Sequence, residues 1–232
     1  MPKREQIEPM FSSISSYYDV LNDFMTFGLH RFWKKKAVLK TQLKKGDSYL
    51  DLCSGTGDLA FFAAKIVGLE GKVIAADFCS PMLEMAKKRA SQKKLTQIEF
   101  LKADVQKLPL NEHTFHAVTI AFGIRNTEDP TQVLRESYRV LKKEGIFVCL
   151  EASSIKNPFL SFFASIFTQK IIPFIVTFFG KNTEAYQYLP SSVKNFWTSE
   201  EMVKKFNEVG FLNIKTQKFL FGATTLYSGQ KK

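Results

Sequence analysis

Two glycines between an apolar strand and a helix constrain this chain more than any other feature. Residues 48–50 are typical of a short buried strand and residues 59–66 of a helix, and the sequence Asp-Leu-Cys-Ser-Gly-Thr-Gly-Asp joins them at residues 51–58. Glycine permits a tight turn and lets a ligand approach the backbone, and a helix N-terminus presents unpaired N–H groups. Such a turn is typical of a nucleotide-cofactor loop in an α/β fold.

The charges that flank this loop distinguish between cofactors. The spacing Gly55-x-Gly57-x-x-Ala60 also satisfies the dinucleotide fingerprint. A dinucleotide, however, places its pyrophosphate on the helix N-terminus, where Asp51 and Asp58 would repel it. Two carboxylates suit S-adenosylmethionine (SAM), which carries an ammonium and a sulfonium. A dinucleotide site and a purely structural corner, with Asp58 at the helix start, remain the alternatives.

Apolar strands and helices alternate after the glycine loop. Further strands are predicted over residues 72–77, 98–101, 116–121 and 145–151, with helices between them. This alternation predicts a doubly wound, mostly parallel sheet whose ligand lies beyond the carboxyl ends of the strands. Two closing strands, over 212–219 and 224–229, are close enough for an antiparallel hairpin that turns about Phe221-Gly222. A seven-stranded α/β sheet of this kind is the Rossmann-like outline of class I SAM-dependent methyltransferases.

Two flanking segments are expected to extend this single domain of residues 1–232. Apolar residues spaced by three and four predict a helix over 7–27 and a second over 30–43, which together form an N-terminal helical cap of residues 1–45. A phenylalanine-rich stretch, 157–180, is interrupted by polar residues and proline, so it predicts two short apolar helices rather than a membrane span. The insertion 157–195 is expected to cover an apolar substrate, with ordinary core packing as the alternative.

The composition limits partners and location. The net charge of +11 is compatible with nucleic acid, an anionic membrane surface or simple solubility; because the basic residues occur in short runs on predicted helix faces, solubility is the default. Three widely spaced cysteines show no metal-ligand spacing and no disulfide framework, so we expect no metal. No apolar segment follows the N-terminus, so no secretory signal is visible and a cytoplasmic location is expected.

Polar residues at the predicted strand ends are the candidates for binding and chemistry. Asp77 lies 20 residues after Gly57, where an acid accepts ribose hydroxyls. Asp104 follows the third strand and could accept from the adenine amino group while Val105 lines the ring; a turn role is the alternative for Asp104. Ala121 ends the fourth strand, facing the methionine end of the cofactor.

A second group of polar residues follows the fourth strand. The guanidinium of Arg125 and the carboxamide of Asn126 can orient a substrate oxygen. A loop salt bridge from Arg125 to Glu128 or Asp129 is the alternative. His30 in the N-terminal segment is a further candidate base, although a lone histidine is more often structural.

Several motifs along nearly the whole chain resemble the ubiquinone/menaquinone biosynthesis C-methyltransferase family (UbiE/MenG type). The glycine loop is shared by many methyltransferases, whereas two later stretches are diagnostic. They are Phe122-Gly123-Ile124-Arg125-Asn126 and Tyr186-Gln187-Tyr188-Leu189-Pro190-Ser191-Ser192-Val193. The chain departs from the pattern at Ala121, where many members carry a serine that contacts SAM.

The resemblance implies methyl transfer from SAM to a ring carbon of a prenylated quinol, either demethylmenaquinol or a methoxy-polyprenyl-benzoquinol precursor of ubiquinone. Arg125 and Asn126 would stabilise the developing phenolate, His30 is the rival base, and Tyr186 and Tyr188 would border the head group. The cofactor set is then Asp51, Gly55, Thr56, Gly57, Asp58, Asp77, Asp104, Val105 and Ala121. Contact with the inner face of the cell membrane is expected, and a homodimer is left open.

Two rival functions use the same SAM-binding core. An RNA methyltransferase, or one acting on another small molecule, would explain the positive charge, but the target-base motif Asn-Pro-Pro-Tyr is absent and no nucleic-acid partner is expected. A non-catalytic, membrane-associated SAM-binding protein would bind SAM without transferring its methyl group.

Overall fold

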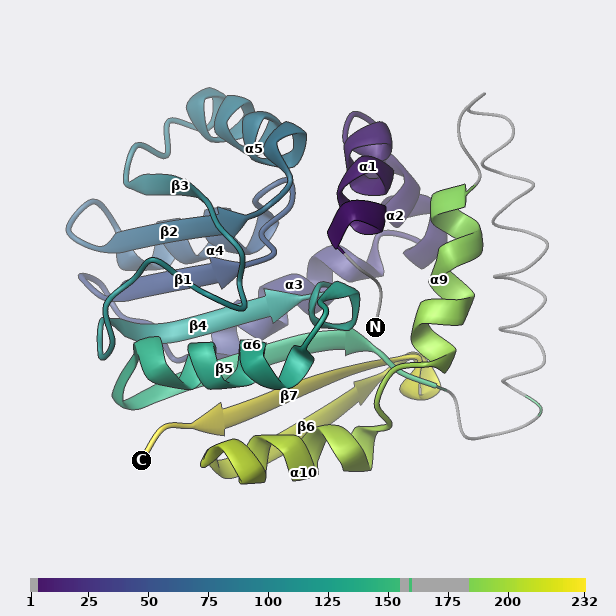
Figure 1. The fold of residues 1–232 in the computed structure, drawn as a ribbon. Coiled ribbons are helices and arrows are strands. Elements are labelled where there is room, and N and C mark those ends of the chain that lie inside the picture. Colours follow the sequence, from purple (N-terminus) through teal and green to yellow (C-terminus); the bar gives the residue numbers. More distant parts are fainter. Residues whose placement is uncertain (1–3, 155–158, 160–183) are drawn as a thin grey trace.

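The computed structural model describes residues 4–154, 159 and 184–232, and the statements below concern these residues. They contain one seven-stranded sheet in the order β3-β2-β1-β4-β5-β7-β6 (Figure 1). The strands are β1 (Ser48–Leu52), β2 (Lys72–Asp77), β3 (Ile98–Lys102), β4 (Phe115–Ala121), β5 (Leu141–Ala152), β6 (Leu212–Phe219) and β7 (Thr224–Gln230). The first five are parallel, and β7 runs antiparallel to both β5 and β6. The predicted sheet and its closing hairpin are confirmed.

The order of the strands reverses at β1, which creates the site for a ligand. Leu50 of β1 lies opposite Ile74 of β2 on one side and opposite Val118 of β4 on the other. The chain therefore leaves β1 in one direction along the sheet and returns to build the other half from β4. In open α/β sheets, ligands bind beyond the carboxyl ends of the strands at this switch point.

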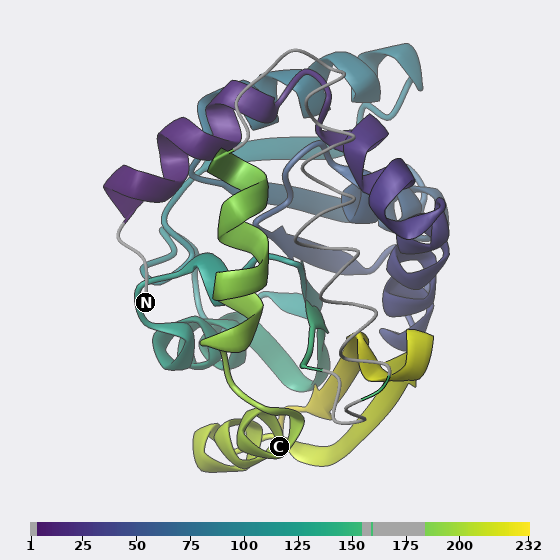
Figure 2. The same ribbon diagram turned by 90° about the vertical axis from the view of Figure 1, so that its right-hand side faces the viewer.

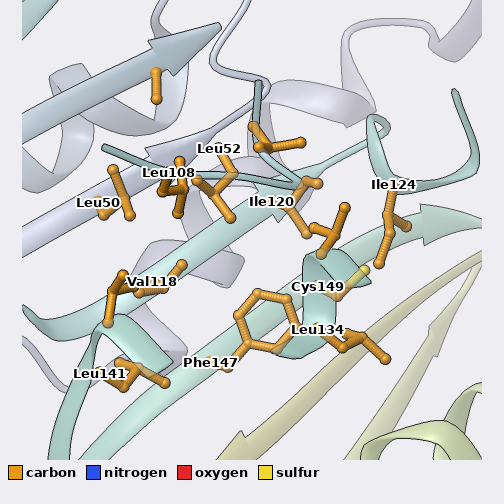
Figure 3. Close-up of a cluster of buried hydrophobic side chains, with 14 of the residues drawn as sticks. Leu50, Leu52, Leu108, Val118, Ile120, Ile124, Leu134, Leu141, Phe147 and Cys149 are labelled. Atoms are coloured by element: carbon orange, nitrogen blue, oxygen red, sulfur yellow. The ribbon is translucent and has the colours of Figure 1, made fainter. Parts of the chain in front are cut away.

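Helices cover both faces of the sheet because its strands are apolar on both. Tyr49 belongs to the core under α3 (Leu29–Lys40) and α4 (Asp58–Val67), to which Ala90 of α5 (Ser80–Gln92) also contributes. The next residue, Leu50, faces the opposite core, under α6 (Pro130–Val140) and α10 (Ser199–Val209). Adjacent strand residues point to opposite faces. Figure 3 shows the second core, where Leu50, Val118 and Phe147 are completely buried.

Three further helices lie at the carboxyl edge of the sheet. Figure 2 shows α1 (Arg4–Ile14), α2 (Tyr18–Thr26) and α9 (Glu184–Lys194) in front of the strand ends. The predicted single helix over 7–27 is wrong, because the chain turns between α1 and α2. There the Ser15 hydroxyl donates to the carbonyl of Ser12, and such side-chain bonds compete with the helical pattern.

The apolar insertion is only partly described. The two helices predicted over 157–180 lie outside the described residues, apart from Phe159, and α9 is the described part of the predicted insertion 157–195. Within the described ranges, no helix combines the length and the apolar character that a bilayer crossing requires.

Candidate cofactor and substrate site

A cavity lies at the carboxyl ends of β1, β2 and β4, at the predicted switch point. Its walls come from the loops after these strands and from α1, α2 and α5. The lining residues are Phe11, Tyr18, Cys53, Gly55, Asp77, Phe78, Cys79, Met82, Ala121, Phe122, Gly123, Asn126 and Thr127. Four of the predicted site residues therefore meet here: Gly55, Asp77, Ala121 and Asn126.

The glycine loop has the backbone that the sequence requires. Gly55 (φ 54°) and Gly57 (φ 91°) are both left-handed, a conformation that favours glycine. A Cβ on Gly57 would lie 2.7 Å from the ring of Phe61, so no side chain fits there, whereas a Cβ on Gly55 would enter open space. The backbone at Gly55 is thus accessible to a ligand in the cavity, and Gly57 leads directly into α4.

The loops after β1 and β4 pack against each other at the cavity floor. A Cβ on Gly123 would lie 2.4 Å from the Cβ of Cys53, so only glycine allows this approach. Cys53 (φ 49°) and Phe122 (φ 56°) hold left-handed backbone without being glycine. Strained backbone of this kind concentrates at functional sites.

Two backbone N–H groups fix the orientation of the Asp77 carboxylate, which suits it to bind ribose hydroxyls. Its Oδ2 accepts from the backbone N–H of Gly55 and its Oδ1 from that of Cys79, each at 2.8 Å. Burial raises the pKa of this carboxyl, and the N–H donors act in the opposite direction. Each carboxylate oxygen has a second lone pair, so Asp77 can still accept from two hydroxyls. The free lone pairs of Asp77 therefore fit the ribose hydroxyls of SAM.

Asp51 is a buried acid whose carboxylate has one oxygen without a hydrogen-bond partner. The Thr119 hydroxyl donates to its Oδ1 at 3.0 Å, while its Oδ2 is buried without a hydrogen-bond partner. Burial raises the pKa of Asp51 to about 7. A nearby cation would stabilise the ionised form, so Asp51 fits a cationic cofactor, although it is not among the residues that line the cavity.

Asp58 is engaged elsewhere. Its Oδ2 accepts from Lys34 Nζ at 2.9 Å and its Oδ1 from Arg89 Nη2 at 2.8 Å. Burial alone would raise the pKa of Asp58, but the charges of Lys34 and Arg89 hold it well below its usual range. The structure therefore corrects the sequence argument: the charge available to a cationic cofactor is that of Asp51 and Asp77, while Asp58 joins α3, α4 and α5.

Four other predicted cofactor residues also lie away from the cavity lining, namely Gly57 and the three described next. The Thr56 hydroxyl donates to Asp19 Oδ1 at 2.7 Å. Asp104 accepts from the backbone N–H of Gln106 at 2.9 Å, which is the turn role named as its alternative. Val105 is buried in the core beneath α6.

Arg125 and Asn126 lie in a short helix after β4, and the structure gives them different surroundings. Arg125 pairs with the buried carboxylate of Glu151 at the end of β5, and its Nη1 donates to the carbonyl of Phe122 at 2.9 Å. The alternative, a loop salt bridge from Arg125 to Glu128 or Asp129, is not formed, because Glu151 takes that place. Arg125 Nε is buried without a hydrogen-bond partner. Glu151 is not among the site residues predicted from the sequence. Its position, as an acid at the end of an apolar strand, is the feature that could have identified it.

Asn126 connects the cavity to α9. It lines the cavity, and its Oδ1 accepts from the Tyr188 hydroxyl at 3.1 Å. Burial raises the pKa of Tyr188, so its hydroxyl remains a donor. Tyr186 lies on the same helix, but its side chain is outside the described residues.

His30 is not brought to the cavity. It is 2% exposed, its Nε2 lies 2.9 Å from Asp23 Oδ1, and its Nδ1 is buried without a hydrogen-bond partner. Burial and the neighbouring Lys34 lower the pKa of His30. The geometry gives it a structural role between α2 and α3.

Comparison with known proteins agrees with this geometry. Residues 1–231 match the sequence model of the ubiE/COQ5 methyltransferase family. The chain is 36% identical to the ubiquinone/menaquinone biosynthesis C-methyltransferase UbiE of Francisella philomiragia, over 99% of this chain and 92% of that protein. It is 35% identical to the demethylmenaquinone methyltransferase of Staphylococcus saprophyticus, over 99% of this chain and 97% of that protein.

Solved structures share the fold at lower identity. A SAM-dependent methyltransferase from Aquifex aeolicus is 20% identical with a TM-score of 0.61, over 86% of this chain and 89% of that one. A SAM-dependent methyltransferase from Thermotoga maritima, described as a possible histamine N-methyltransferase, is 21% identical with a TM-score of 0.66, over 96% and 99%.

Proposed function

Because the chain belongs to the ubiE/COQ5 methyltransferase family, we propose that it transfers a methyl group from SAM to a ring carbon of a prenylated quinol. The names of its relatives support menaquinol or ubiquinol precursors as acceptors. One observation carries the proposal at the level of the site. One cavity is lined both by Asp77, whose carboxylate suits ribose hydroxyls, and by Asn126, whose side chain accepts from Tyr188 of α9.

The walls of the cavity suit a flat aromatic ring. Phe11, Phe78, Met82 and Phe122 supply apolar surface from four different segments. Aromatic rings pack favourably against such side chains. Asn126 and the Tyr188 hydroxyl bonded to it would then hydrogen-bond to the oxygens of that ring.

Arg125, Asn126 and Tyr188 would activate the ring. A ring carbon beside a phenol is a weak nucleophile until the hydroxyl loses its proton, so the site must favour the phenolate. Asn126, which lines the cavity, and the Tyr188 hydroxyl bonded to it would supply hydrogen bonds that are in place before the reaction begins. Arg125, which neighbours Asn126 but does not line the cavity, would add a positive charge that its pair with Glu151 partly offsets. The proton would leave to a water beside Asn126, since His30 is turned to Asp23 and does not line the cavity. SAM, when bound, supplies the electrophilic methyl group.

The acceptor can be tested directly. Purified protein is incubated with SAM and either a short-chain demethylmenaquinol or a short-chain methoxy-benzoquinol, under reducing conditions. Mass spectrometry is expected to show one additional methyl group on a ring carbon of at least one of them. Binding of SAM without product from either quinol would contradict the proposed function.

The natural acceptor carries a prenyl tail, which belongs in a bilayer. We therefore place the enzyme in the cytoplasm, in peripheral contact with the inner face of the cell membrane. The net charge of +11 supports this placement, because that face is anionic.

A further inference from the structure

The outer side of α3 carries apolar residues where a surface helix ordinarily carries polar ones. Its inner side, with Trp33, Ala37 and Val38, is buried in the core. Its outer side presents Phe32 (52% exposed) and Leu39 (56% exposed) at a spacing of two turns, with Leu29 at the start of the helix. Among the described residues, the inner side of α3 packs in the core, whereas its outer side carries apolar residues interleaved with exposed basic ones.

Two phenylalanines project further at the carboxyl edge, beside the start of α3. Phe27, between α2 and α3, is 83% exposed, and Phe221, in the turn between β6 and β7, is 78% exposed. Both hold left-handed backbone, with φ of 50° and 55°. Glycine or asparagine is the usual residue in that conformation, so neither phenylalanine is explained by the needs of its turn.

These segments lie together in space although they are far apart in the sequence. The ring of Trp33 stacks on Phe219 at 5.9 Å, which joins α3 to the end of β6. Figure 2 shows the β6–β7 turn, in yellow, near α3. We name this region the α3 surface; its apolar members are Phe27, Leu29, Phe32, Leu39, Leu220 and Phe221.

Basic side chains outnumber acidic ones around the α3 surface, where Asp23 of α2 is an acid that pairs with Arg31. Neither residues 29–40 nor residues 212–222 contain an acid. Lys35, Lys36 and Lys218 are exposed, and Lys36 Nζ lies 5.4 Å from the centre of the Phe32 ring. Aromatic and apolar residues interleaved with lysine on one helix side are the pattern of a helix that lies in a membrane interface.

We propose that the α3 surface docks onto an anionic phospholipid bilayer. Phe27 and Phe221 enter the boundary between head groups and acyl chains, and the lysines contact lipid phosphates. The cavity opens at the same carboxyl edge, because Tyr18 of α2 lines it and α2 leads directly into Phe27. This inference rests on the proposed function only for the substrate that the bilayer would deliver.

The test is co-sedimentation of the full chain with vesicles of phosphatidylcholine, with or without phosphatidylglycerol. Phe27→Asn/Phe221→Asn is expected to lower the vesicle partition coefficient at least about tenfold, since two large apolar side chains are lost. Asparagine tolerates left-handed backbone, so the double variant should fold. Leu69→Asn is the matched control, because Leu69 is 77% exposed but lies before β2, at the opposite edge of the sheet.

The charge component has its own pair of variants. Lys35→Gln/Lys36→Gln is expected to weaken binding severalfold, only with phosphatidylglycerol present and mainly at low salt. Lys44→Gln/Lys143→Gln, which removes exposed lysines near the amino ends of the strands, should change binding little. Equal losses in both pairs would overturn the proposal, since they would indicate an effect of net charge alone.

Two further results separate this proposal from others. Unchanged vesicle binding by Phe27→Asn/Phe221→Asn would overturn it, as would loss of self-association in place of vesicle binding, which would assign the surface to a second copy of the chain. No quinol is present in these assays. Failure of methyl transfer to a short-chain quinol would therefore leave the docking result standing, and loss of docking would leave methyl transfer to that soluble quinol intact.

Discussion

Asp51 and Asp77 lie near the ends of neighbouring strands, but their carboxylates have different hydrogen-bond partners. Both oxygens of Asp77 accept N–H groups of the loops that follow β1 and β2, whereas Asp51 has one buried oxygen without a partner. A carboxylate fixed by two N–H donors has its remaining lone pairs aimed in defined directions. Asp77 is therefore suited to hydroxyl groups at fixed positions, and Asp51 to a positive charge.

Replacing Asp77 should therefore affect the cofactor first. Asp77→Ala is expected to weaken SAM binding by about tenfold or more, because charge-assisted hydrogen bonds contribute roughly 1.5–3 kcal/mol each. Isothermal titration calorimetry measures the change, and circular dichroism checks the fold. Asp104→Ala is the comparison, since Asp104 bonds Gln106 and does not line the cavity. Unchanged affinity in Asp77→Ala would remove Asp77 from the ribose site.

Arg125 is expected to affect turnover rather than cofactor binding. Arg125→Ala should lower turnover at saturating SAM by roughly 10²–10³-fold, the usual effect of losing one stabiliser of a developing anion, with the SAM dissociation constant little changed. That variant also leaves Glu151 buried without its partner, which destabilises the fold. Arg125→Ala/Glu151→Gln restores neutrality and should fold better while remaining equally slow. Turnover at the wild-type level on a quinol would exclude Arg125 from the chemistry.

At the scale of elements, α1 and α2 form an outer wall that is fastened to the glycine loop. Asp19 of α2 accepts from the Thr56 hydroxyl at 2.7 Å and pairs with Arg89 of α5 at 2.9 Å. Arg89 also donates to the carbonyl of Thr56 at 2.8 Å. Phe11 and Tyr18, on these two helices, line the cavity. The contacts of Asp19 therefore decide whether that wall is in place.

Asp19→Asn should loosen this wall without removing a group that lines the cavity. SAM affinity is expected to fall severalfold, and hydrogen exchange in residues 4–26 to become faster. The control is Asp23→Asn on the same helix, since Asp23 pairs with Arg31 and His30 and not with the glycine loop. Equal effects of the two variants would indicate general weakening of α2 rather than a specific fastening.

The elements that the sequence predicts well are those whose signal is local. The apolar strands, the glycine loop and the closing hairpin each depend on residues that are close in the chain, and all were predicted. The pairs Asp19–Thr56, Arg125–Glu151 and Trp33–Phe219 join residues 26 or more positions apart, so no spacing rule reveals them. This is why Asp58 was assigned to the cofactor: its partners Lys34 and Arg89 come from other helices.

At the scale of the whole molecule, buried acids with opposite shifts should give stability an optimum in mild acid. The folded pKa of Asp58 is depressed, so its contribution is present above its unfolded pKa and is lost as pH falls. The folded pKa of Asp51 is raised to about 7. Between its unfolded value and about pH 7 the folded state binds the extra proton, so stability falls as pH rises through that window.

Chemical denaturation of the cofactor-free protein across this pH range tests the expectation. The free energy of unfolding should be highest near about pH 4–5 and decline toward about pH 7, by an amount on the order of a few kcal/mol. Asp51→Asn should flatten the decline, and saturating SAM should move the optimum to higher pH. An identical decline in Asp51→Asn would assign it to another group.

The wall formed by α1 and α2 should also affect the rates at which a ligand binds and dissociates. Phe11 and Tyr18 line the cavity from this wall, so the Asp19 contacts that hold the wall should also influence how fast a molecule enters and leaves the cavity. The residence time of a bound molecule should therefore become shorter in Asp19→Asn, because the wall beside that molecule loses its contacts with Thr56 and Arg89.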